Sequence, residues 1–262
     1  MDATRVPDAE VVGEIEELLA RDFVRYGYHK VTHHLRGRGY VINKKKVYRL
    51  MQERGLLLKR RIRSRGRRDF VAGRARPCGP HRLLEMDIKY LYIHGEGRNA
   101  YLLTVLDTFS RRALGFRLGR NMRKREVIGL LEEILSLLPE PEGVVVRSDN
   151  GSQFIAAVVR EYLKERGIRQ EFTHVGVPED NAHIEAFHSI LEDEVAMAYE
   201  FETFEELEAT LERYFRFYNS ERIHSSLGYM SPDAFLRKYF EQELAEELEE
   251  GVLKDSDLLA KI

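Results

Sequence analysis

The sequence predicts an α/β fold, with a mixed sheet that carries helices on both faces, preceded by a small all-α domain. Strand-like segments at residues 83–93, 100–109 and 112–119 follow one another directly, and helices and strands then alternate. The first 58 residues show only the apolar spacing of amphipathic helices. A strongly basic stretch separates these two parts, so the sequence predicts two folded units joined by a linker.

Residues 1–58 are predicted to form a helix-turn-helix-like DNA-binding domain. Asp8 is expected to cap a first helix, a second runs over about residues 29–35, and Asn43 is expected to cap a third over 44–54. The third helix has an apolar stripe, and its cations lie mostly off that stripe, namely Lys44, Lys45, Lys46 and Arg49. A basic second helix after a turn suits the major groove of DNA, although a solvated charged helix has the same pattern.

The linker is predicted over residues 59–80. Between Lys30 and Arg76 there are 17 lysines and arginines and only two acids. A segment this basic does not pack into a core, and its cations are expected to lie along DNA phosphates, with Arg60, Arg61, Arg63 and Arg65 as contacts. A disordered, solvated linker is the alternative, and the two are compatible because such arms can order on binding.

The larger unit is predicted over residues 81–200, continued by helices over 201–240. After the three strands come a helix at 122–138, a buried strand at 143–149, a helix at 152–166, a strand at 168–175 and helices at 181–198 and 203–219. Thr203 and Glu206 are expected to form a capping box. This order of elements suits a ribonuclease-H-like domain. An acidic tail is predicted over residues 241–262, either as a solvated extension or as a partner helix.

Three carboxylates from separate elements form the candidate site. Asp87 lies within an apolar strand, where a charge is unfavourable unless it is compensated. Asp149 lies where a strand ends at a glycine turn, and Glu185 follows it by 36 positions in the first turns of a helix. Acidic oxygens suit Mg²⁺ or Mn²⁺, and two such ions support displacement at phosphorus. With 44 acids in the chain, however, spacing alone does not single out this triplet.

Longer motifs give the triplet its context. The stretches EMDIKYL, DTFSRR, SDNGSQF and PEDNAHIEAFHSILEDE resemble the core motifs of retroviral-integrase-type transposases. YNSERIHSSLGYMSP and YGYHKVTHHLRGRGYVINKKKVYRLMQERGLL resemble the C-terminal signature and the N-terminal segment of the insertion-sequence-three family, as its second reading-frame product. The resemblance covers roughly residues 9 to 240. It implies that Asp87, Asp149 and Glu185 hold two Mg²⁺ or Mn²⁺ ions for cleavage and strand transfer of double-stranded DNA.

The resemblance has further implications. It implies transposon ends and target DNA as partners, a homo-oligomer assembled on DNA, and a fusion partner made from an upstream reading frame. A cytoplasmic, nucleoid-associated bacterial protein is expected, since no segment approaches membrane-spanning length. The alternatives are a catalytically inactive DNA-binding regulator of transposition and a nuclease acting on hybrid duplexes. The single cysteine, Cys78, excludes an internal disulfide and a four-cysteine zinc site.

Neighbouring residues have weaker predicted roles. Lys89 shares a strand face with Asp87 and is a candidate phosphate contact. Asn150 and Gln153 are candidate DNA contacts, although a turn role for Asn150 and a plain surface role for Gln153 are equally consistent. Further expectations are a structural Asp107, Asn181 as the cap of the Glu185 helix, and a packing role for the residues around Arg222, with a DNA contact from Arg222 itself. Glu192 departs from the resemblance, because the family often has a lysine seven positions after the catalytic glutamate; this departure favours the inactive alternative.

Overall fold

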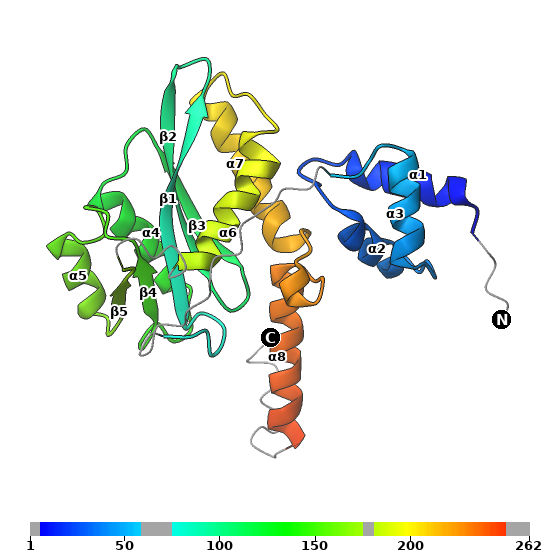
Figure 1. Ribbon diagram of the computed structural model, residues 1–262. Helices are drawn as coiled ribbons and strands as arrows, with labels where there is room; N and C mark the ends of the chain where they lie inside the picture. The colour runs from blue at the N-terminus through cyan, green and yellow to red at the C-terminus, as the bar shows by residue number, and fades with distance from the viewer. Residues whose placement is uncertain (1–5, 59–74, 175–180, 250–262) are drawn as a thin grey trace.

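The computed structural model describes residues 6–58, 75–174 and 181–249. The expected DNA contacts Arg60, Arg61, Arg63 and Arg65 lie outside the described residues. Within those ranges the chain folds into a three-helix N-terminal unit and a larger unit built on a five-stranded sheet (Figure 1). None of the described helices is long and apolar enough to cross a membrane.

The N-terminal unit consists of α1 (Asp8–Leu19), α2 (Tyr28–Gly37) and α3 (Lys44–Glu53). Asn43 caps α3 as expected, since its side-chain oxygen accepts a hydrogen bond from the Lys46 amide at 2.9 Å. Gly55 follows in the left-handed region, which ends the helix. The prediction for Asp8 was wrong, because Pro7 occupies the N-cap and Asp8 lies in the first turn. There the Asp8 carboxylate pairs with Lys46 and Arg49 of α3, both at 2.7 Å.

The sheet has the strand order β3-β2-β1-β4-β5. Its strands are β1 (Leu83–Ile93), β2 (Arg98–Asp107), β3 (Ala113–Gly119), β4 (Val145–Ser148) and β5 (Arg169–Phe172). β1, β2 and β3 pair antiparallel, whereas β4 and β5 run parallel to β1. The predicted mixed, ribonuclease-H-like sheet is therefore confirmed, and β1 lies at its centre with β2 on one side and β4 on the other.

Helices cover both faces of the sheet, as predicted (Figure 1). One face packs against α4 (Lys124–Ser136) and α5 (Ala157–Lys164). The other packs against α6 (Ala182–Leu191), which continues through a π-helical turn (Glu192–Ala196), and against α7 (Phe204–Ser220). Thr203 caps α7 by accepting from the Glu206 amide, while the Glu206 carboxylate accepts from the Glu202 amide, so the expected capping box forms one residue displaced.

Aromatic side chains join the N-terminal unit to the helices of the larger unit. Phe23 packs edge-on against Tyr214 at a centroid distance of 5.3 Å and also contacts Tyr199 and Phe217. The Ile223 amide donates to the Tyr26 hydroxyl at 3.2 Å. The apolar residues of the N-terminal unit therefore form one continuous buried cluster with those of α6, α7 and the sheet face that these helices cover.

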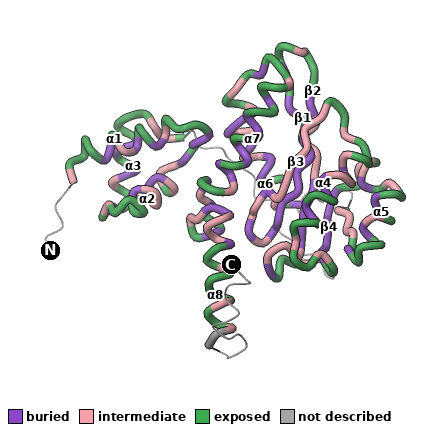
Figure 2. Tube along the Cα trace, turned by 180° about the vertical axis from the view of Figure 1, so that it is seen from behind, coloured by how far each residue is buried: buried purple, intermediate pink, exposed green. Residues whose placement is uncertain are grey.

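The last helix, α8 (Pro232–Glu249), crosses the boundary expected at residue 240. Arg112 ties its first turn to the end of the sheet through a 2.8 Å ion pair with Asp233. Figure 2 shows that most of the helix beyond this point is exposed. The described part of the acidic segment is thus the solvated continuation of a helix that starts in the folded core.

Candidate active site

Asp87 lies in the middle of β1, on the face that α6 covers. Glu85, Asp87 and Lys89 share this face because alternate residues of a strand point the same way. One carboxylate oxygen of Asp87 accepts from the Ile88 amide at 2.8 Å, and the other lies 3.3 Å from Nδ1 of His188 on α6. The side chain of Asp87 remains partly exposed, as a ligand-binding carboxylate requires.

Asp149 follows the last residue of β4, the strand beside β1. The Gly151 amide donates to its carboxylate at 2.9 Å and holds the turn in shape. Burial raises the pKa of Asp149, and the negative charge of Asp87 raises it further, while the bond from Gly151 acts in the opposite direction. In the parallel register of β1 and β4, Asp87 and Asp149 each lie two residues beyond the last pair, Glu85 and Arg147, so a cation bound between them would relieve their repulsion.

Glu185 lies in the first turn of α6 and lines the same pocket as Asp87. This pocket has a volume of about 510 Å³, and its walls also include Lys89, His188 and Glu192. Among the residues that the structure describes, no three acidic, histidine or cysteine side chains converge tightly enough to form a complete metal site. The arrangement thus brings Asp87 towards Asp149 on one side and Glu185 on the other, without gathering all three at one point.

Lys89 and Glu192 form an ion pair across this pocket, with Nζ and Oε2 2.5 Å apart. Lys89 comes from β1 and Glu192 from the start of the π-helical turn after α6. The acid at position 192 therefore has a cation of its own within the pocket. Glu192 therefore has a structural role in this pocket, as the partner of Lys89.

The turn after Asp149 differs from its prediction. The expected helix over 152–166 starts only at Ala157, so Gln153 does not open a helix and lies in the preceding turn. The side-chain Nδ2 of Asn150 donates to the Thr173 carbonyl at 2.8 Å, and this bond ties the end of β4 to the end of β5. A Cβ at Gly151 would lie 2.4 Å from the side-chain Nε2 of Gln153, so a larger residue at this position would displace the Gln153 side chain.

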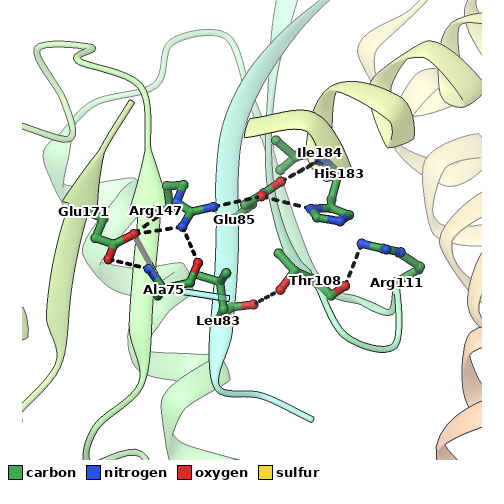
Figure 3. Close-up of polar contacts among 9 residues, drawn as sticks. All are labelled: Ala75, Leu83, Glu85, Thr108, Arg111, Arg147, Glu171, His183 and Ile184. Carbon is green, nitrogen blue, oxygen red and sulfur yellow. Dashed lines mark hydrogen bonds and ion pairs between the residues drawn. The ribbon is translucent and has the colours of Figure 1, made fainter. Parts of the chain in front are cut away.

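Asn181 does not cap the helix of Glu185, contrary to expectation. Its side chain makes no capping bond to α6, and its buried Oδ1 has no hydrogen-bond partner among the described residues. The cap comes instead from Glu85, a buried residue of β1 that the sequence analysis missed (Figure 3). The missed signal was a charged residue inside an apolar strand, the same signal that marked Asp87.

A second buried network lies beyond α6. The Arg222 guanidinium donates to both oxygens of Glu194 at 2.8 Å, and the Tyr214 hydroxyl donates to the same carboxylate at 3.2 Å. Arg222 is only 5% exposed, so the expected DNA contact from Arg222 was wrong. Asn219, near Arg222 in the sequence, packs against the sheet: its side-chain oxygen accepts from the Ala113 amide at 3.0 Å and its side-chain nitrogen donates to the Ala113 carbonyl at 2.9 Å.

Asp107 has the structural role that was predicted for it. Its carboxylate accepts from the Ser110 amide at 3.1 Å and from the Ser110 hydroxyl at 2.5 Å. It also accepts from the His81 amide at 3.2 Å, so it closes the turn between β2 and β3 onto the start of β1. The carboxylate is fully buried, which leaves it unable to reach a substrate.

The candidate DNA contacts of α3 fall into two pairs. Lys44 and Lys45 are exposed, and no ion pair of theirs occurs within the described ranges. Lys46 and Arg49 are both engaged by Asp8, and Arg49 also pairs with Glu53 at 2.8 Å. The exposed face of α3 thus presents its two N-terminal lysines most openly.

Comparison with known proteins places both units. Residues 77–178 and 166–232 match models of the integrase core domain, and residues 7–64 match a model of an HTH-like domain. The chain is 32% identical to the putative transposase InsK for insertion sequence element IS150 of Escherichia coli (strain K12), over 86% of this chain and 82% of that protein. It is 30% identical to the transposase InsF for insertion sequence IS3A of the same organism, over 82% and 77% respectively.

The fold is similar to that of a retroviral integrase. The match is to a chain of the simian T-cell lymphotropic virus intasome in complex with PP2A regulatory subunit B56 gamma, with a TM-score of 0.51 and 15% identity. It covers 83% of this chain and 70% of that one.

Proposed function

Because this chain belongs to the insertion-sequence-three family of transposases, and so is a DNA transposase with an integrase core, we propose that Asp87, Asp149 and Glu185 are its metal-binding catalytic residues. The observation that carries this assignment is the placement of the three acids: Asp87 on the central strand β1, Asp149 at the end of the neighbouring parallel strand β4, and Glu185 in the pocket that Asp87 lines. The chain cleaves insertion-sequence ends and joins them to target DNA.

The donor set fits two Mg²⁺ or Mn²⁺ ions. Carboxylate oxygens are the ligands that these ions prefer, and like charges on Asp87 and Asp149 favour cation binding. When bound, such ions activate the attacking oxygen and stabilise the leaving oxygen at phosphorus. Asp87 and Asp149 would hold the ions from the sheet and Glu185 from α6. Lys89, beside Asp87, would meet a phosphate of the DNA end once it leaves its ion pair with Glu192.

The reaction needs no nucleophilic side chain. In cleavage, water attacks a phosphodiester, one P–O bond forms, another breaks, and a DNA 3′-hydroxyl is released. In joining, that hydroxyl attacks a phosphodiester of the target and displaces a second 3′-hydroxyl, so bonds broken and formed balance. The residues of this chain would hold the metal ions and orient the DNA, so that the attacking oxygen is aligned with the phosphate.

DNA binding is supplied by the N-terminal unit and the basic linker. Lys44 and Lys45, with Lys46 and Arg49 once Asp8 releases them, would contact phosphates or bases from α3. Asn150 and Gln153 border Asp149 and would contact the DNA there. Two DNA ends must meet for joining, so we propose that the chain acts as a homo-oligomer on DNA, in the cytoplasm at the nucleoid.

The test is strand cleavage and joining on labelled insertion-sequence ends with Mg²⁺ or Mn²⁺. We expect activity from the unaltered chain, none from Asp149→Asn or Glu185→Gln, and DNA binding by all three. Glu140→Gln is the control, because the Glu140 side chain is 74% exposed and pairs only with Arg82 in the described structure.

Two outcomes would contradict the assignment. Activity that survives Asp149→Asn and Glu185→Gln would refute these residues as metal ligands. DNA binding without activity in any form, fused or unfused to an upstream-frame segment, would instead support the regulatory alternative.

A further inference from the structure

The helix that carries Glu185 lacks a cap from its own neighbourhood. The first amides of any α-helix have no acceptor within the helix, and a side chain just before the helix usually supplies one. Asn181 occupies that position in α6, but its side chain makes no such bond. The amides of His183 and Ile184 therefore need an acceptor from elsewhere in the fold.

Glu85 supplies that acceptor from the central strand (Figure 3). Its Oε2 accepts from the His183 amide at 3.0 Å and from the Ile184 amide at 2.9 Å. Its Oε1 lies 3.1 Å from Nδ1 of His183. Glu85 precedes Asp87 by two residues on the same strand face, and Ile184 directly precedes Glu185. One carboxylate thus links the strand of the first catalytic acid to the helix of the third.

The Glu85 carboxylate is also held in place on the side that faces away from α6. Glu85 is only 1% exposed, and Arg147 of β4 lies 3.6 Å from its Oε1. Arg147 is itself held by Glu171 of β5 at 2.9 Å and by the Ala75 carbonyl at 2.8 Å (Figure 3). Burial raises the pKa of Glu85 to about 7, while the bond from Ile184 and the charge of Arg147 act against this rise. The positive end of the helix dipole also favours a carboxylate at this position.

We propose that Glu85 is a positioning residue, which fixes the first turn of α6 and thereby sets where Glu185 lies relative to Asp87. This inference rests on the proposed role of Asp87 and Glu185 as metal ligands. The bonds of Glu85 are made to the two residues before Glu185, so any displacement of that turn moves Glu185 directly. Asp87, by contrast, stays with its strand.

The competing explanation is that Glu85 only stabilises the fold. Glu194 is the matched control, because it is a carboxylate of similar burial, 2% exposed, that lies beyond the other end of α6 and bonds to Arg222. Removing either charge destabilises the chain, but only Glu85 contacts the first turn. A difference between the two variants at that turn and at the metal site therefore separates positioning from general stability.

The experiment compares Glu85→Gln with Glu194→Gln in the full chain without DNA. Two quantities are measured, namely the amide hydrogen exchange of Ile184 relative to Phe187 in the middle of α6, and Mn²⁺ affinity from the electron paramagnetic resonance of the free ion. For Glu85→Gln we expect exchange at Ile184 to be about tenfold faster, because the side-chain amide of glutamine is a weaker acceptor than a carboxylate. We expect Mn²⁺ to bind roughly 10- to 100-fold more weakly, the range for residues that orient metal ligands.

Glu194→Gln should leave both the exchange ratio and the Mn²⁺ affinity unchanged. Glu85→Asp keeps the charge but withdraws the carboxylate by one methylene, so it should act in the same direction and substitutes for Glu85→Gln if that variant does not fold. Wild-type values in both Glu85 variants, or equal losses in Glu194→Gln, would overturn the proposal. If the unaltered chain binds no Mn²⁺, the metal assignment itself fails, while the exchange ratio still decides whether Glu85 anchors the helix.

Discussion

The ion pair between Lys89 and Glu192 predicts an effect opposite to the one that the family resemblance suggests. By resemblance alone, Glu192→Lys restores a cation that the family often carries and should improve DNA joining. In the structure, however, the same change places a second cation against Lys89, whose Nζ lies 2.5 Å from the Glu192 carboxylate. We therefore expect Glu192→Lys to lower both stability and joining activity.

The magnitude follows from the distance and the exposure of the pair. Two unit charges about 4 Å apart interact by about 4 kcal/mol near a protein surface before solvent screening and side-chain entropy are counted. Lys89 is 24% exposed and Glu192 is 40% exposed, so most of that value is screened and about 1 kcal/mol remains. Replacing attraction by a repulsion of similar size therefore lowers the free energy of unfolding by about 2 kcal/mol.

A double-mutant cycle measures this interaction. It compares the urea unfolding of Lys89→Glu, of Glu192→Lys and of the double variant that carries both changes. The double variant restores the pair with its charges exchanged and should recover most of the lost stability. Its joining activity should stay low, because an acid then replaces the cation beside Asp87. Additive effects on stability, or a gain in joining from Glu192→Lys alone, would refute the reasoning.

Two further predictions concern the network around Arg222. Removing one partner of the buried pair, by Glu194→Gln or Arg222→Met, should lower the free energy of unfolding in urea by about 3–5 kcal/mol, because a buried charge is left uncompensated. Replacing both partners should lower it much less. Similar losses in the single and double variants would contradict this prediction. Lys30 lies over the Tyr26 ring, with its Nζ 4.7 Å from the ring centroid. Burial lowers the pKa of Lys30 from 10.5 to about 7; the charge of Arg222 adds to this shift, and the charge of Glu194 opposes it. Neutral His224 also lies nearby. Between these two values the unfolded chain binds a proton that the folded chain does not, so stability should rise with pH from about 7 to 10. Lys30→Met should remove the contribution of Lys30 to that rise, and an unchanged pH slope in this variant would show that Lys30 is not its source.

The elements that the sequence predicted well are those set by local patterns. Apolar periodicity identified the three N-terminal helices and the five strands, and Asn43 acts as a cap because its acceptor lies three residues from its donor. The burial of Asp107 was also predictable, since its partner Ser110 lies in the same turn. In each case the interacting groups are close along the chain, so composition and spacing carry the information.

The errors arise where the partner is distant in sequence. Asn181 has the residue type of a cap, but Glu85, 98 positions away, takes the amides of α6. Glu192 was interpreted only as a departure from the family pattern, because its partner Lys89 lies on another element. Gln153 was placed on a helix, but the turn that contains it is tied to the region of β5, because the Asn150 side chain donates to the Thr173 carbonyl. These contacts depend on how distant strands and helices pack, which no local pattern encodes.

The same packing gives the acidic stretch its partners. Residues 170–212 contain no lysine or arginine, so the cations that meet this stretch come from other parts of the chain. Lys89 of β1 pairs with Glu192, and Arg25 of the N-terminal unit donates to the Asp193 carbonyl at 2.8 Å. These contacts hold α6 and its π-helical turn against β1 and against the N-terminal unit. Because phosphate contacts need lysine or arginine, the cations that meet DNA must also come from other elements than this stretch.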